Sequence, residues 1–372
     1  MDFELSAEQE ALAESVRSVL ERECPIARVR ERVEKGLDPE QPWCSATRLG
    51  WCGIGVPEPL GGAGLGFLDL ALVIEQHGFA LAPGPFLATT TQFAPLLREA
   101  GSPEQQERLL GTVAAGACRG ALAVAGESGA CFPSDASLRA RPDGSGFRLE
   151  GTRHFVIEGD VADEIAVAAR VEAGDGVGLF AVPRAAVQAH RIQSLDASRS
   201  LATLVFEGVS VAPDRVLGKP GASEPALSRA LDAAAAALAL EMVGTCQALF
   251  ERTLSYARER RQFGHPIGSF QAIQHALADD LAALEKARAT GYFAAMAIAE
   301  DDPRRSLAAS MAKASAGDCQ RRLAKDAIQI HGGIGFTWEH DVQLFVKRAK
   351  SGEALLGSSD WHRERIASLL LG

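Results

Sequence analysis

The spacing of hydrophobic residues changes twice along this chain of 372 residues, and that order constrains the fold more than any other feature. Apolar residues recur at helical intervals in the first third of the chain. From about Gly120 they gather in short strand-like segments, and after Gly221 the helical interval returns. Separate blocks of helices and strands predict an α+β multidomain protein. We expect an N-terminal α-helical domain at residues 1–118, a middle antiparallel β-domain at 119–220 and a C-terminal four-helix bundle at 221–372.

The predicted N-terminal domain contains a clear helix start and a glycine-rich loop. Ser6 and Gln9 form a capping-box pattern ahead of an apolar stripe. The loop at Gly55–Gly66 precedes another predicted helix. Its glycines lack the spacing of a dinucleotide-binding fingerprint, and no βαβ pattern surrounds them, so they predict a tight loop.

The two later domains follow from equally local signals. Asp143-Gly144-Ser145-Gly146 predicts a hairpin turn between strands of the β-domain. The other predicted strands lie at residues 121–127, 146–159, 164–171, 177–183 and 202–213. Long Ala-rich helices are expected at Ser223–Arg260, Phe270–Glu300 and Arg304–His331, with shorter ones at Glu339–Lys350 and Asp360–Leu371.

Composition excludes several classes of function. The formal net charge of -10 and the absence of long basic runs argue against a nucleic-acid partner. The longest apolar run, Ala233–Leu240, has eight residues and is too short to span a bilayer, so we expect no membrane insertion. The acidic N-terminus does not resemble a signal peptide. Seven scattered cysteines without CxxC spacing predict reduced thiols in a cytoplasmic protein, and no metal-ligand cluster is evident.

Two segments combine polar residues and glycines at the ends of long predicted helices. The first, Tyr256–His275, carries Arg260, which can donate paired charged hydrogen bonds to a diphosphate. The second, Gln329–His340, carries Gly332-Gly333, where the backbone can approach a ligand without a Cβ in between. Each segment alone is also compatible with a helix cap and surface salt bridges.

Taken together and in this order, these segments resemble the acyl-CoA dehydrogenase family over essentially the whole chain. The resemblance also includes the Gly55–Gly66 loop followed by Glu75 and the strand motif around Gly151–Gly159. It implies FAD as the cofactor, bound partly across a subunit interface. The positions that match the family's contacts to the diphosphate and adenine side of FAD are Arg260, Gln262, Phe263, Gln329, Gly332 and Gly333.

The resemblance also implies a reaction. A carboxylate removes the α-proton of an acyl-CoA thioester, and the β-hydrogen leaves as hydride to the flavin. Such chemistry needs a base near the α-carbon, hydrogen bonds to the thioester carbonyl and a dry apolar slot. The implied partners are an electron-transfer flavoprotein as electron acceptor and either a second copy of this chain or a homologous subunit.

The flavin-ring residues differ from the family pattern. The usual Thr-Glu-Pro and Gly-Ser-Asp motifs correspond here to Gly126-Glu127-Ser128 and the stretch GACFPSD. Phe155-Val156-Ile157 replaces a tryptophan-x-threonine motif. Phe155 can still stack on a ring, whereas Gly126 and Ile157 supply no hydroxyl.

The usual catalytic glutamate is missing as well. Leu355-Leu356-Gly357-Ser358 stands where the family has Tyr-Glu-Gly-Thr, and Ala234 occupies an alternative position of the base. Glu241 lies in an apolar run seven residues after Ala234, on the same helix face about 10.5 Å further along. It is the candidate base, and the structural alternative is that it pairs with an arginine or caps a buried turn. His331 is expected to pack at a helix end.

Two hypotheses therefore compete. The chain is either an FAD-dependent acyl-CoA dehydrogenase that uses Glu241 or a less obvious base, or a non-catalytic subunit of a heterotetrameric acyl-CoA dehydrogenase. In the second case it supplies adenine-side FAD contacts to a homologous partner. A flavin oxidase of the same superfamily is a third possibility that no residue selects, and the acyl group, including a sterol-derived one, is not determined.

Overall fold

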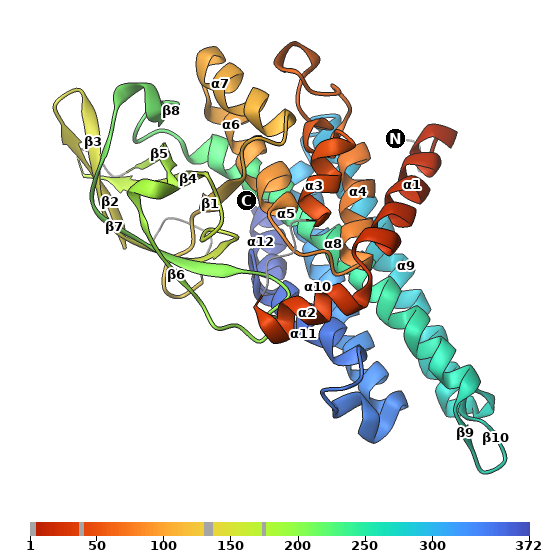
Figure 1. The fold of residues 1–372 in the computed structure, drawn as a ribbon. Coiled ribbons are helices and arrows are strands. Elements are labelled where there is room, and N and C mark those ends of the chain that lie inside the picture. Colours follow the sequence, from red (N-terminus) through yellow and green to blue (C-terminus); the bar gives the residue numbers. More distant parts are fainter. Residues whose placement is uncertain (1–4, 37–40, 130–136, 173–175) are drawn as a thin grey trace. The chain divides into compact units, whose positions relative to one another are not determined.

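The computed structural model describes residues 5–36, 41–129, 137–172 and 176–372, which divide into two compact units (Figure 1). We name them the helical unit (Met1–Leu37, Ala71–Ala82 and Ala235–Gly372) and the sheet unit (Asp38–Leu70 and Pro83–Ala234). Helices α4 (Phe67–Phe79) and α8 (Glu224–Glu259) contribute residues to both units. The three-domain division expected from the sequence remains a prediction.

The helical unit contains the long helices that the apolar spacing predicts. The capping box of Ser6 and Gln9 begins the first helix, as expected, with each side chain bonded to the other's backbone. The three longest predicted helices begin and end within one residue of their expected bounds. Besides parts of α4 and α8, the unit has α1 (Ala7–Glu23), α2 (Ile26–Lys35), α9 (Gln271–Ala299), α10 (Arg305–His331), α11 (Val342–Ala354), α12 (Ser359–Leu371), the hairpin strands β9 (Arg261–Gln262) and β10 (His265–Pro266), and the 3-10 turns η6 (Ile267–Ser269) and η7 (Gly332–Phe336).

Helix α8 is long and apolar enough to cross a membrane by length and composition alone. However, 94% of its most apolar window is buried within the folded chain. An apolar helix that other helices surround on all sides is typical of a bundle core. The hydrophobic surface of α8 is therefore used in packing.

Two glycines allow α4 and α8 to cross closely in the helical unit. A Cβ atom on Gly78 would lie 1.9 Å from the carbonyl oxygen of Glu241, and one on Gly244 would lie 1.9 Å from that of Glu75. These distances are far below van der Waals contact, so neither position accepts a larger residue without a shift of the backbone. The crossing fixes the position of Glu241 along α8.

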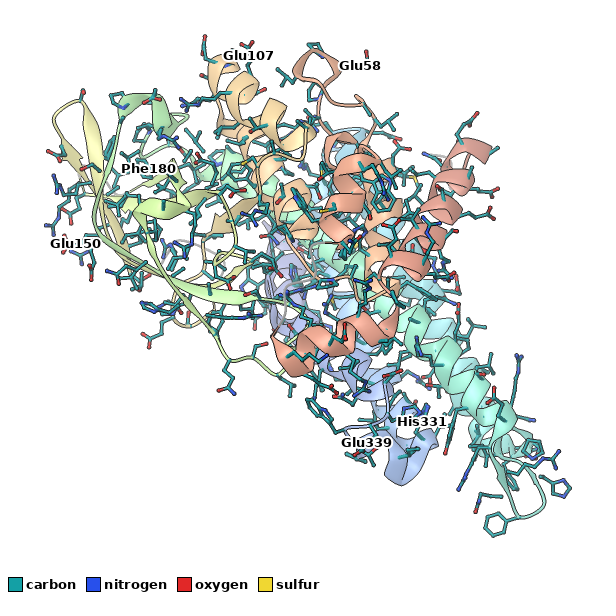
Figure 2. The ribbon with its side chains drawn as sticks, viewed as in Figure 1. Glu58, Glu107, Glu150, Phe180, His331 and Glu339 are labelled. Carbon is teal, nitrogen blue, oxygen red and sulfur yellow. The ribbon has the colours of Figure 1, made fainter. Side chains whose placement is uncertain are left out.

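The sheet unit is built on one eight-stranded sheet, in the order β6-β7-β3-β2-β4-β5-β8 with β1 paired to β4. Most pairs are antiparallel, as expected for the middle β-domain, whereas β1 and β2 both pair with β4 in parallel. Phe180 lies in the core of this unit, and Glu150 lies on its surface (Figure 2). The strands are β1 (Gly120–Ala123), β2 (Leu138–Asp143), β3 (Gly146–Ile157), β4 (Glu164–Val171), β5 (Val177–Pro183), β6 (Gln188–Arg191), β7 (Leu201–Val211) and β8 (Val216–Leu217).

The predicted hairpin is present, because Asp143 ends β2 and pairs with Gly146 at the start of β3. Strands β2 and β6 were not predicted, since their exposed charged residues hide the apolar alternation. The helices of the sheet unit are α3 (Gln41–Arg48), α5 (Phe86–Ala88), the π-helical turn η3 (Thr89–Phe93), α6 (Ala94–Ala100) and α7 (Pro103–Ala114), with 3-10 turns η1 (Trp51–Gly53), η2 (Glu58–Leu60), η4 (Arg184–Ala186) and η5 (Pro213–Arg215).

Candidate functional site

The turn that follows α8 presents three of the predicted cofactor residues to solvent. Arg260 is exposed, and its backbone closes the hairpin by bonding to Tyr256 and Ile267. Phe263 sits at the tip with a φ of 53° and 89% of its surface exposed. Figure 1 shows this hairpin, β9–β10, projecting past the ends of α8 and α9. An exposed phenylalanine in a left-handed conformation is costly in a free chain and is typical of a binding surface.

The second predicted segment begins where α10 ends. Gln329 is exposed on the last turn of α10, and Gly332 adopts a φ of 63°. A Cβ atom on Gly332 or Gly333 would meet no other atom within 4 Å. The chain therefore does not need glycine at Gly333 for its own packing, and the pair leaves a bare stretch of backbone open to an external group.

An aromatic stack brings these two segments together. The ring of Tyr256, on α8, lies parallel to that of His331, with centroids 4.3 Å apart. His340 packs edge-on against His331 at 4.9 Å. Burial lowers the pKa of His331. The hydrogen bond between its ring nitrogen and the carbonyl oxygen of Ala327, 2.8 Å long, acts in the opposite direction. His331, which Figure 2 labels, is thus a residue that packs at a helix end, as expected from the sequence.

The combined surface has donors that suit a phosphate-containing ligand. Among the described residues, no hydrogen bond or ion pair occupies the guanidinium of Arg260. The Gln262 side-chain amide donates to the neighbouring carbonyl of Arg261, at 2.8 Å. A guanidinium beside exposed backbone can bind a diphosphate by charge-assisted hydrogen bonds, and an exposed ring can stack on a planar base.

Phe155 lies in the sheet unit at an irregularity of β3. The register of β3 and β7 shifts between Arg153 and Val156, and Phe155 has a φ of 54°. Phe155 is 38% exposed, and its ring lies next to Gly129. Ile157 is buried in the core of the sheet and offers no polar group to a ligand. Most of the GACFPSD stretch, residues 130–135, lies outside the described residues.

Glu241 is buried on α8, where its carboxylate accepts a hydrogen bond of 2.6 Å from the guanidinium of Arg348 on α11. The two side chains are 5% and 2% exposed. The nearby imidazole of His77 has its pKa lowered to about 4, mainly by burial and against the opposing effect of the Glu241 charge. This arrangement is a buried ion pair, the alternative that the sequence left open. Its catalytic role stays a prediction.

The loop Leu355–Ser358 is anchored by two buried side chains, Lys313 and His362, that were not predicted from the sequence. Leu356 adopts a φ of 55°, an unusual conformation for a leucine. Lys313, with no exposed surface, donates to the carbonyl oxygens of Glu353 and Gly357 at 3.2 and 2.8 Å. A nitrogen of His362 lies 2.9 Å from the Leu356 carbonyl, and burial together with Lys313 lowers the pKa of His362 to about 3.

A signal for the buried charges was available in the sequence. Lys313 and Arg348 each interrupt a stripe of small or apolar residues on a helix, as Glu241 does. Buried charges are normally paired, so an isolated charge on an apolar stripe predicts a partner on another helix. Within the described ranges, no group of three or more His, Cys, Asp or Glu side chains is arranged to hold a metal ion.

Comparison with known families gives matches at both ends of the chain. Residues 6–117 match the family described as "Acyl-CoA dehydrogenase, N-terminal domain". Residues 225–371 match the one described as "Acyl-CoA dehydrogenase, C-terminal domain".

Individual relatives cover nearly the whole chain. "Acyl-CoA dehydrogenase IpdE2" of Mycobacterium tuberculosis is 31% identical over 94% of this chain and 93% of its own length. The solved ChsE4-ChsE5 complex from Mycobacterium tuberculosis contains a chain that is 28% identical, with a TM-score of 0.90 and coverage of 100% and 99%. The structure described as the Tcur3481-Tcur3483 steroid ACAD is 30% identical, with a TM-score of 0.86 and 98% coverage of both chains.

Proposed function

We propose, from the premise that this chain belongs to the acyl-CoA dehydrogenase family, that it acts as one subunit of an acyl-CoA dehydrogenase whose catalytic base lies on a homologous partner. The observation that carries the proposal is the contrast between an exposed cofactor surface and a buried carboxylate. Arg260 and Phe263 face solvent, whereas Glu241 is held by Arg348 inside the helical unit.

The residues that would hold FAD are those of the two exposed segments. Arg260 and Gln262 would donate to the diphosphate, and Gly333 would offer its backbone without steric hindrance. Phe263 would stack on the adenine side. FAD, when bound, supplies the acceptor for the hydride that leaves the β-carbon of the acyl-CoA. The donors present and the open backbone fit such a group. The complete proposed set is Arg260, Gln262, Phe263, Gln329, Gly332, Gly333 and, on the sheet unit, Phe155.

The chemistry of α,β-dehydrogenation needs a carboxylate that can reach the α-carbon of the substrate. In this chain the position of the usual base is Leu356, whose side chain cannot accept a proton. The loop around it is nevertheless held firmly by Lys313 and His362. A firmly bonded loop around an inert side chain favours a subunit that keeps the fold and lacks the base.

The second candidate function is a self-sufficient FAD-dependent dehydrogenase with Glu241 as the base. It would require Glu241 to leave Arg348 or to act from within the ion pair. Replacement by Gln keeps the size and hydrogen bonding of the side chain but removes its charge. Glu241→Gln with unchanged turnover and retained FAD would exclude Glu241 from the mechanism, whereas a loss of turnover with a folded, FAD-loaded protein would support it.

The remaining assignments follow from the same proposal. We expect a bulky acyl-CoA as substrate, because one similar structure is that of a steroid ACAD. An electron-transfer flavoprotein is the proposed electron acceptor, and the protein is expected in the cytoplasm. The name of the ChsE4-ChsE5 complex, with two different chains, supports a hetero-oligomer over a homo-oligomer.

The visible absorption spectrum tests the proposal. The chain purified alone should be colourless, and it should gain a flavin band when it is co-expressed with a homologous subunit. A chain that carries flavin by itself, and whose flavin band bleaches on addition of an acyl-CoA, would contradict the proposal and support the self-sufficient enzyme.

A further inference from the structure

Arg30 on α2 makes an unusually large number of hydrogen bonds to a segment that lies more than 300 residues away in sequence. Its guanidinium donates to the carbonyl oxygens of Trp338 and Glu339, at 2.8 and 3.1 Å. It also donates twice to one carboxylate oxygen of Asp341, at 3.1 and 2.7 Å. Two backbone carbonyls and a carboxylate therefore converge on one planar, fully ionised group.

Glu34, one turn later on α2, completes this contact. Its carboxylate accepts from Arg30 at 3.2 Å and from the indole nitrogen of Trp338 at 3.2 Å. The ammonium group of Lys347 lies 4.2 Å from the centre of the Trp338 ring, within cation–π range. The segment Trp338–Asp341 is thus held from two helices, α2 and α11, and its path is fixed by both side-chain and backbone bonds.

The fixed segment leads directly to the aromatic stack. His340 lies between Trp338 and Asp341 and packs edge-on against His331, which in turn stacks on Tyr256. His331 immediately precedes the Gly332-Gly333 turn, and Tyr256 lies one helical turn before Arg260. A displacement of the Trp338–Asp341 segment would therefore move the glycine turn relative to the arginine.

We infer that Arg30 is a positioning residue for the adenine-side cofactor surface, acting through Trp338–Asp341 and the stack of Tyr256, His331 and His340. The inference rests on the proposed FAD role of Arg260 and Gly332-Gly333. Arg30 does not touch the ligand surface itself. Its function is to hold the Arg260 turn and the Gly332-Gly333 turn in a fixed position relative to each other. Ligand binding then does not have to order them.

The alternative is that Arg30 only adds stability to the helical unit. A purely stabilising contact would change the unfolding free energy without a selective effect on one segment. A positioning contact would loosen residues 332–341 and weaken the ligand while the helices stay protected. The two roles therefore differ in where amide exchange increases.

The experiment compares Arg30→Met with Arg30→Lys and with Arg28→Met. Arg28 is an exposed arginine on the same helix and serves as the matched control. Hydrogen–deuterium exchange is measured across the whole chain, and the dissociation constant of FAD is measured on the complex that the chain forms with its co-expressed homologous subunit. Lys keeps the charge but cannot form the planar fork, so it should restore only part of the effect.

For Arg30→Met we expect amides of residues 332–341 to exchange roughly tenfold faster and FAD to bind roughly tenfold more weakly, as for the loss of one well-formed charged hydrogen bond. Amides in the middle of α9 and α10 should keep wild-type rates, and Arg28→Met should change neither quantity. Exchange that rises equally throughout the helical unit, or FAD affinity that does not change, would overturn the inference. A wild-type protein that binds no FAD in any oligomeric form would contradict the proposed cofactor role itself, and with it the positioning role of Arg30.

Discussion

The helical unit contains two sets of polar residues with opposite surroundings. Glu241 and Arg348 are almost fully buried and bond to each other. Arg260 and Phe263 are exposed after the end of α8, and the Gly332-Gly333 turn is exposed after the end of α10. Phe263 and Gly332 have positive φ angles. In the first set the two charges neutralise each other inside the fold. The second set exposes hydrogen-bond donors and glycine backbone to solvent.

This difference separates stability from ligand binding. A buried charge pair is sensitive to the loss of either member, because the remaining charge has no water to solvate it. An exposed charge can be removed with little effect on folding. Substitutions in the buried set should therefore change the free energy of unfolding, and substitutions in the exposed set should change the affinity for FAD.

The largest effect is expected for Arg348→Met. It leaves the Glu241 carboxylate buried without its main counter-charge, and the free energy of unfolding should fall by about 3–5 kcal/mol in urea denaturation. Arg363→Met, which breaks exposed pairs with Asp318 and Asp360, should cost under about 1 kcal/mol. Glu241→Leu combined with Arg348→Met should recover most of the loss. A double variant no more stable than Arg348→Met alone would show that the unpaired Glu241 charge does not cause the loss of stability.

The second largest loss of stability is expected for Gly78→Ala. Its Cβ would lie 1.9 Å from the carbonyl oxygen of Glu241, so α4 and α8 would have to separate. The expected loss is about 1–3 kcal/mol in the free energy of unfolding. Gly333→Ala is the matched exposed change, with nothing within 4 Å, and should stay within about 0.5 kcal/mol. Equal losses in both variants would remove the distinction between packing glycines and ligand-facing glycines.

The free energy of unfolding should also decrease as the pH is lowered, because His77 is buried in its neutral form. Burial lowers its folded-state pKa to about 4, below the ordinary value of 6.5, so the unfolded chain binds this proton more readily. Stability from this group is fully present above pH 6.5 and is lost as the pH falls toward 4, at up to about 1.4 kcal/mol per pH unit. His77→Gln should reduce the slope in this part of the pH profile, and the contribution of His362, whose pKa is also lowered, should remain. His275→Gln, an exposed change on α9, should leave it unaltered; the same slope in both variants would argue against His77.

The smallest effect on stability is expected for Arg260→Met. The side chain is exposed, so the unfolding free energy should change by less than about 0.5 kcal/mol. The affinity for FAD, measured by isothermal titration on the assembled protein, should fall about tenfold or more. Arg258→Met, two residues earlier on α8, should alter neither. Retention of full FAD affinity in Arg260→Met would place the diphosphate elsewhere.

The sequence by itself determined the elements and their order. Some elements were predicted from signals between residues that are close together in sequence. Examples are the capping box at Ser6, the turn at Asp143–Gly146 and the apolar spacing of Arg304–His331. They act through neighbouring backbone and side-chain sterics, which need no tertiary context. The exposed candidate residues Arg260 and Gly333 were likewise found from local motifs, although their ligand remains proposed.

Only the tertiary structure decided which charges meet. Arg348 lies 107 residues from Glu241, and Asp341 lies 311 residues from Arg30. The parallel pairing of β1 and β2 with β4 was also beyond local reasoning. Such pairs depend on how whole helices and strands pack, because packing sets both the distance between two charges and the water around them. For that reason the sequence identified Glu241 as a buried carboxylate, but only the fold showed that an arginine already holds it.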